Sequence, residues 1–199
     1  YAAGRANTTG TSNAFLGVTT GYSNTTGYLN SFVGNSAGYA NTTGTSNAFL
    51  GYRAGYSNTS AYYNVFVGNE AGFYNTTGAS NTFLGTSAGT TNATGSYNLY
   101  LGNSSDGSAA LSSSIAIGYG ATATASNQLL IGSNNTNGSI TDAYFGQGVT
   151  KASPAGITLN ATGGSGLNNA GAPLTIASGK ATGNAVGGSL IFQTSAAGA

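Results

Sequence analysis

The chain has 199 residues, of which 39% are apolar and only 4% are charged, with four Lys and Arg residues against three Asp and Glu. Four scattered cations do not make the basic patch that nucleic-acid binding needs, and no apolar run approaches the roughly 20 residues of a membrane-spanning helix. Apolar residues at regular intervals exclude a disordered chain. The scarcity of strong helix formers beside abundant Gly, Ser, Thr and Asn excludes a helical fold. The composition therefore indicates a near-neutral all-β protein.

A seventeen-residue unit is repeated six times between Asn7 and Gly102. Its first half reads Asn-Thr-Thr-Gly, which suits a β-turn, and its second half reads Asn-x-aromatic-aliphatic-Gly, which suits a short strand and a tight corner. Self-similarity at a short fixed period is typical of a solenoid, in which each unit buries its apolar face against its neighbours. We therefore predict one turn of a parallel β-solenoid per unit, with coils about 4.8 Å apart.

Each predicted strand carries two adjacent apolar residues, an aromatic one followed by an aliphatic one. Adjacent strand residues point to opposite faces, so a strand apolar on both faces is expected to be covered on both. One column can fill the coil interior, and the other needs a cover that a neighbouring subunit would supply. This pattern predicts an oligomer. The aromatic column, expected to be a core or interface ladder, is Phe15, Phe32, Phe49, Phe66, Phe83 and Tyr100.

After Gly102 the register of the repeat changes. Residues 103–114 are polar and are expected to form an irregular joint. The apolar-Gly motif then returns at fourteen-residue spacing, at Ile117-Gly118, Ile131-Gly132 and Phe145-Gly146. This spacing predicts smaller coils that continue the solenoid and bring the expected total to about nine coils.

From about Lys151 the repeat is lost, and short alternating segments separated by Gly-rich turns predict a small β module. The expected organisation has three parts. These are a seventeen-residue-repeat β-solenoid over 1–102, a fourteen-residue-repeat β-roll continuation over 103–150 and a Gly-rich C-terminal β module over 151–199.

The first Asn of every seventeen-residue unit lies in the acceptor pattern Asn-x-Ser/Thr. The same residues also suit turns, and columns of Asn can form internal hydrogen-bonded ladders, which we favour for the column that begins at Asn13. N-glycosylation would place one sugar on each coil. The candidate glycosylation sites are Asn7, Asn24, Asn41, Asn58, Asn75 and Asn92.

A second aromatic column and a column of Thr pairs repeat at the same spacing. The aromatic column is expected to pack in the core or at a subunit interface, or else to form an exposed surface on which glycans stack. The Thr pairs, such as Thr8-Thr9, serve turns or form a flat array that could bind ice. The aromatic column is Tyr22, Tyr39, Tyr56 and Phe73.

The chain has few of the residue types that carry out catalysis. His and Cys are absent, and the acids Glu70, Asp106 and Asp142 are far apart in sequence. General acid–base catalysis and nucleophile activation need a titratable pair or a base within reach, and calcium-binding solenoid turns need repeated carboxylates. We therefore predict no catalytic residue, no metal site and no cofactor.

Three segments carry a resemblance to known families. Residues 114–118 (Ser-Ile-Ala-Ile-Gly), followed by residues 121–123 and 127–132, resemble the head repeats of trimeric autotransporter adhesins. In that family a fourteen-residue coil builds a left-handed parallel β-roll with three chains to a head. The seventeen-residue units look like a longer variant found in large bacterial surface proteins and phage tail fibres. Residues 179–195 resemble the segment that precedes a self-cleaving intramolecular chaperone in many fibre proteins.

These observations favour a homotrimeric β-solenoid that serves as an extracellular structural or adhesive fibre segment, a phage tail-fibre or bacterial adhesin shaft, attaching to a host-cell receptor or glycan. Its expected location is a cell surface or a virion tail. The alternative is a subunit of a self-assembling extracellular filament, with or without glycosylation, whose coils stack end to end because solenoids without polar caps associate. A third hypothesis is a monomeric solenoid that binds ice or glycan. Neither nucleic-acid binding nor membrane insertion is expected.

Overall fold

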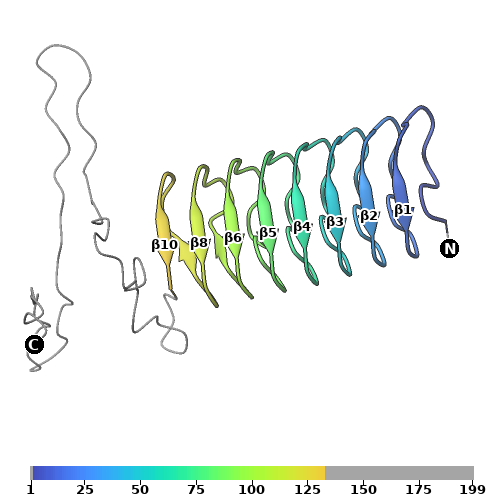
Figure 1. Ribbon diagram of the computed structural model, residues 1–199. Coiled ribbons are helices and arrows are strands. Elements are labelled where there is room, and N and C mark those ends of the chain that lie inside the picture. Colours follow the sequence, from blue (N-terminus) through green and yellow to red (C-terminus); the bar gives the residue numbers. More distant parts are fainter. Residues whose placement is uncertain (1, 133–199) are drawn as a thin grey trace, which may run out of the picture. The chain divides into compact units, whose positions relative to one another are not determined.

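The computed structural model describes residues 2–132, all of them within one compact unit of the chain. This part is all-β, and its coils stack so that eight short strands form one parallel sheet in the order β1-β2-β3-β4-β5-β6-β8-β10 (Figure 1). The predicted parallel β-solenoid is confirmed. The main-sheet strands are β1 (Ala14–Leu16), β2 (Ser31–Val33), β3 (Ala48–Leu50), β4 (Val65–Val67), β5 (Thr82–Leu84), β6 (Leu99–Leu101), β8 (Ile115–Ile117) and β10 (Leu129–Ile131).

The expected ninth coil at Phe145, the expected C-terminal module over residues 151–199 and the fibre-like segment over residues 179–195 lie outside the described residues. Within residues 2–132, no helix is long and apolar enough to cross a membrane.

The register of the sheet follows the repeat. Phe32 pairs with Phe49, seventeen positions on, whereas Leu99 of β6 pairs with Ile115 of β8, sixteen positions on, and Ile115 pairs with Leu129 of β10, fourteen positions on. The expected irregular joint over residues 103–114 is therefore wrong. These residues belong to a complete coil, and their strand β7 (Asp106–Gly107) pairs with β9 (Thr122–Ala123) in a second, two-stranded sheet. The strands stay aligned because the turns absorb the shortening.

The Asn-Thr-Thr-Gly segments form turns that join one coil to the next. The backbone N–H groups of Thr25, Thr26 and Gly27 all donate to the carbonyl oxygen of Thr42 in the following coil, at 2.9, 3.2 and 3.3 Å. The side chain of Asn24 closes its own turn by donating Nδ2–H to the carbonyl of Gly27 at 3.0 Å. The turn residues thus satisfy the backbone hydrogen bonds that a buried corner would otherwise leave unpaired.

A column of glycines stands at the corner directly after the strands. Gly51 has φ of 144°, and a Cβ atom placed on it would lie 2.2 Å from the carbonyl oxygen of Gly68 in the next coil. A side chain does not fit that approach, and L-residues rarely adopt that φ. Glycine therefore sets how closely successive coils stack at this corner.

The core is a single file of aromatic rings along the axis. In β1 to β6 the central residue is aromatic and points inward, and the rings of Phe32, Phe49, Phe66 and Phe83 are 0–1% exposed. In β8 and β10 the central residues are Ala116 and Leu130. Consecutive rings in the file stack with centroids 4.7–5.2 Å apart. Such pairs add roughly 0.5–1.5 kcal/mol each beyond the burial of their area. The small buried residues Ala37, Ala54, Ala71 and Ala88 belong to the same core cluster.

Candidate interaction surfaces along the solenoid

The aromatic column predicted as a core or interface ladder lies in the core. Phe32 through Tyr100 are fully buried, and Phe15, in the first strand, packs partly buried against them. These rings pack against one another inside the coils and are not available to a partner. They leave the aliphatic column beside them as the surface that faces outward.

Both Asn columns form internal ladders, as predicted for the column that begins at Asn13. In that column Asn47 accepts from the backbone N–H of Asn64 at 3.0 Å through Oδ1 and donates from Nδ2 to the carbonyl of Ala61 at 2.8 Å. In the other column Asn41 donates to Oδ1 of Asn24 at 2.8 Å. Direct side-chain bonds in this second column join Asn7, Asn24, Asn41 and Asn58.

The second Asn column contains the candidate glycosylation sites, and most of them are buried. Five of the six side chains are 0% exposed: Asn24, Asn41, Asn58, Asn75 and Asn92. A glycan on any of these five would occupy the coil interior, so the folded coil excludes it. Asn7, in the first coil, is exposed, and its glycosylation stays a prediction.

The second aromatic column lies half-buried on the flank of the coils. The rings of Tyr22, Tyr39, Tyr56 and Phe73 stack face to face with centroids 5.0–5.1 Å apart and nearly parallel planes. Arg5 occupies the same position in the preceding coil and lies 5.4 Å from the Tyr22 ring centroid. Because each inner ring has a ring on both sides, a sugar cannot stack on those faces. The solvent meets the edges of the rings.

The outward side of the main sheet is mostly apolar, and the third residue of each of its strands is a Leu, Val or Ile. We call it the outer face, meaning the first and third residues of its eight strands. Leu16 is 69% exposed, Leu50 is 50% exposed and Leu129 is 62% exposed. None of its residues is charged, and nothing in residues 2–132 covers it. The third-position residues are Leu16, Val33, Leu50, Val67, Leu84, Leu101, Ile117 and Ile131, and the first-position residues are Ala14, Ser31, Ala48, Val65, Thr82, Leu99, Ile115 and Leu129.

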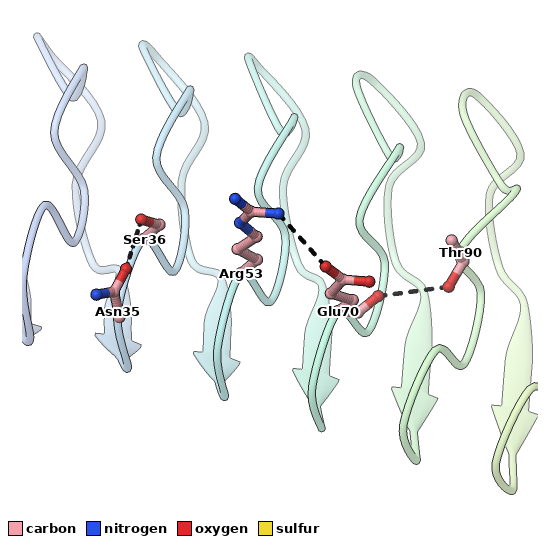
Figure 2. Close-up of polar contacts among 5 residues, drawn as sticks. All are labelled: Asn35, Ser36, Arg53, Glu70 and Thr90. Atoms are coloured by element: carbon pink, nitrogen blue, oxygen red, sulfur yellow. Dashed lines mark hydrogen bonds and ion pairs between the residues drawn. The ribbon is translucent and has the colours of Figure 1, made fainter.

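Charged side chains in residues 2–132 bridge neighbouring coils. Figure 2 shows Arg53 reaching Glu70 of the next coil, with 3.6 Å between Nη1 and Oε1. The hydroxyl of Thr90 donates to the backbone carbonyl of Glu70 at 3.4 Å, and Ser36 bonds the side chain of its neighbour Asn35 at 2.8 Å. A half-exposed ion pair of this kind contributes about 0–1 kcal/mol.

Asp106, in β7, forms no ion pair with a cation of residues 2–132. Its Oδ2 accepts from the backbone N–H of Thr91 at 3.0 Å, and its Oδ1 accepts from that of Gly107 at 2.8 Å. Burial nevertheless raises the pKa of Asp106. Burial, with the nearby Asp106 carboxylate, also raises the pKa of Tyr100 to about 12. Glu70 lies in a different coil, and Asp142 lies outside the described residues.

Sequence reasoning missed the large residues at the two corners that flank the outer face. The leading edge is the residue two positions before each strand, and the trailing edge is the residue two positions after it. Tyr63 and Tyr97 of the leading edge are 63% and 69% exposed, and Tyr52 and Tyr119 of the trailing edge are 42% and 55% exposed. Their signal in the sequence is an alternation over two units rather than one.

Comparisons of the chain with protein-family models, with curated proteins and with solved structures find no match. Residues 2–132 enclose no pocket and contain no group of three or more His, Cys, Asp or Glu residues that could hold a metal ion. The outer face and its edges are therefore the surfaces on which a function can be argued.

Proposed function

We propose that this chain is a structural segment of an extracellular fibre in which three copies pack through their outer faces. One observation carries the proposal: an uncharged and mostly apolar strip runs along all eight strands of the main sheet, and none of residues 2–132 covers it. Monomeric proteins rarely expose a continuous apolar strip of this length. Burying a large aliphatic side chain contributes roughly 1.5–3 kcal/mol, so a row of them provides ample driving force.

The direction of the strip supports a fibre rather than a compact assembly. The outer face runs parallel to the stacking axis (Figure 1), so copies that bury it lie side by side along that axis. Hydrogen bonds between successive coils continue through the described stack and would make each chain stiff. Three chains side by side would also present three copies of any binding tip, which raises avidity.

The attachment role and the extracellular location rest on the resemblance of residues 114–132 to adhesin head repeats. We propose a phage tail fibre or a bacterial surface adhesin as the setting, with a host-cell receptor or glycan as the target. The trimer is the form of oligomer that this resemblance favours.

Sedimentation equilibrium on residues 1–199 tests the proposal. We expect a particle of three chains whose mass does not change over a wide range of protein concentration. A particle of one chain would contradict the proposal and would favour the monomeric ligand-binding solenoid. Growth without limit as concentration rises would favour the end-to-end filament instead.

A further inference from the structure

The leading edge alternates between small and large residues from coil to coil. Backbone hydrogen bonds tie leading-edge residues to the preceding coil. The N–H of Tyr63 donates to the carbonyl of Thr45 at 3.2 Å, and the N–H of Tyr97 donates to the carbonyl of Ala79 at 3.0 Å. Among the first seven coils, the odd-numbered coils carry Ser and the even-numbered coils carry Leu or Tyr, whereas the eighth coil, that of β10, carries Asn127. From the coil of β1 to that of β8, the residues are Ser12, Leu29, Ser46, Tyr63, Ser80, Tyr97 and Ser113.

The trailing edge alternates in the opposite phase. In the first seven coils it carries Asn in each even coil, where the leading edge is large, and Val, Thr or Tyr in each odd coil, where the leading edge is Ser. The fifth coil is the level at which both edges are small, with Ser80 and Thr86. In the same order the residues are Val18, Asn35, Tyr52, Asn69, Thr86, Asn103 and Tyr119.

Stability of a single chain does not explain the large leading-edge residues. Leu29, Tyr63 and Tyr97 have φ of 57°, 59° and 62°, in the left-handed region that bulky side chains rarely adopt. They are also 56–69% exposed, so the strain is not offset by burial within the chain. Backbone strain at an exposed site points to a role in function.

Crowding between coils does not explain the alternation either. The core rings stack in each coil from β1 to β6 without alternation, with centroids 4.7–5.2 Å apart. Large side chains at every coil are therefore compatible with this stacking. The opposite phases of the two edges suggest instead that they meet across an interface.

We propose that the leading edge of one chain packs against the trailing edge of the next chain at the same level. Leu29 and Tyr63 would then lie opposite Asn35 and Asn69, and Ser46 would lie opposite Tyr52. This contact joins two different surfaces of identical chains, and such contacts can close into a ring. A shift of one coil would set Tyr against Tyr, so the alternation fixes the height at which the chains join. The inference rests on the proposed oligomer and adds the two surfaces that meet in it.

The first test exchanges the large residue between the two edges of one coil. Ser46→Tyr places two tyrosines opposite each other at the third level, and we expect it to weaken association by roughly tenfold or more for each interface. Adding Tyr52→Asn turns that level into a copy of the fourth, which carries Tyr63 and Asn69. Because the two substitutions fall on one contact, their effects should offset each other rather than add, and we expect the double variant to associate within about threefold of the parent chain.

Recovery of association in the double variant is expected only if the two edges meet at the same level. Tyr52→Asn alone leaves small residues on both edges of that level and serves as the matched control. If the double variant is as weak as the sum of its single variants, the two edges do not meet. That result would indicate that the alternation records only the duplication of a two-coil unit.

The second test uses the absence of cysteine from the chain. Ser80→Cys with Thr86→Cys puts one thiol on each edge of the fifth coil, and we expect oxidation to yield covalent trimers on a non-reducing gel. Ser46→Cys with Thr86→Cys places the thiols two coils apart, about 10 Å along the axis. That spacing is beyond the reach of a disulfide, and we expect no covalent trimer from this control.

The two tests separate failure of this inference from failure of the proposed function. A trimer by sedimentation that shows neither rescue nor matched cross-linking would overturn the edge pairing and leave the fibre proposal standing. Dimers cross-linked by Ser80→Cys alone would overturn it in favour of a two-fold contact of the leading edge with itself. A particle of one chain would overturn both proposals.

Discussion

At the scale of single residues, buried polar side chains hold the coils in register. Asn47 uses both ends of its amide: it donates to the carbonyl of Ala61 and accepts from the backbone N–H of Asn64. Both partners lie in the segment just before β4. An Asn at this position satisfies one donor and one acceptor of the backbone, and this explains why the column persists through every seventeen-residue unit.

Replacing Asn47 by Leu should destabilise the fold, since Leu has a similar size but leaves the backbone groups of Ala61 and Asn64 unpaired. Each buried unpaired group costs about 1–3 kcal/mol, so we expect a loss of roughly 2–5 kcal/mol in the free energy of unfolding. Urea denaturation followed by circular dichroism measures it. Thr43→Ala, at an exposed turn residue, should stay within about 0.5 kcal/mol. An equal effect of both substitutions would contradict the role of the ladder.

Asp106 predicts a pH dependence of opposite sign to that of a salt-bridged acid. Its pKa in the folded chain is raised above the ordinary value of 3.8 because burial disfavours the carboxylate. Between the unfolded and folded pKa values the folded chain binds more protons, so the free energy of unfolding falls as pH rises through that window. Asp106→Asn should remove this fall.

Thermal unfolding of the parent chain and of Asp106→Asn, at several pH values on both sides of 3.8, measures the effect. The background is small because the whole chain has only three acidic residues. Thr43→Ala, which changes an exposed turn residue and removes no titratable group, is the control and should keep the slope of the parent. A slope that survives Asp106→Asn unchanged would assign the pH dependence to another group.

At the scale of the element, each coil is a three-residue strand, a glycine corner and a tight turn. The strand is too short to be stable alone, and its pairing with the strands before and after it supplies the hydrogen bonds. The close approach of Gly51 to Gly68 makes that pairing possible at the corner. Stability is therefore shared between neighbouring coils, as expected for a solenoid.

Gly51→Ala should disturb two coils at once, since the added Cβ would lie 2.2 Å from the Gly68 oxygen and φ is 144°. Strain and overpacking together suggest a loss of roughly 2–5 kcal/mol. A lowered melting temperature by circular dichroism is the expected result. Ser57→Ala is an equally small change on a half-buried turn residue, and its melting temperature should be close to that of the parent. A melting temperature for Gly51→Ala that matches the parent would show that the corner can open.

At the scale of the whole molecule, the proposed oligomer depends on the outer face. Leu50, Val67 and Leu84 are consecutive members of its third-position row and point away from the core of their own chain. We expect their joint replacement by Asn to dissociate the particle into single chains while the β-sheet circular dichroism signal remains. Each replaced side chain would no longer contribute about 1.5–3 kcal/mol of hydrophobic stabilisation to the interface, and the chains would therefore separate.

Thr25→Asn, Thr42→Asn and Thr59→Asn together form the control for that variant. They lie in the partly buried turn column away from the strands, and sedimentation should show the parent mass. A triple outer-face variant that keeps the parent mass would mean that the chains associate through another surface, or not at all.

Much of the fold follows from the repeat itself. A seventeen-residue period with Asn, Gly and paired apolar residues predicts stacked coils, because only neighbours of the same kind can cover each short apolar run. The Asn13 ladder is predictable for the same reason, since identical polar residues in register can bond along the axis. The two-coil alternation of the edges is present in the sequence. Only the bounds of the strands show that the alternating residues flank the outer face on its two sides.

The sequence by itself determined the period, the parallel stacking and the presence of two apolar columns on opposite faces of each strand. It did not determine which column points inward, because alternation assigns opposite faces without naming the interior. Closure of the coil decides this: Phe49 points inward and Leu50 outward. The same closure buries Asn41 and stacks the ring of Tyr39 between those of Tyr22 and Tyr56. Only the tertiary structure decided these roles, since burial depends on what the next coil places against each side chain.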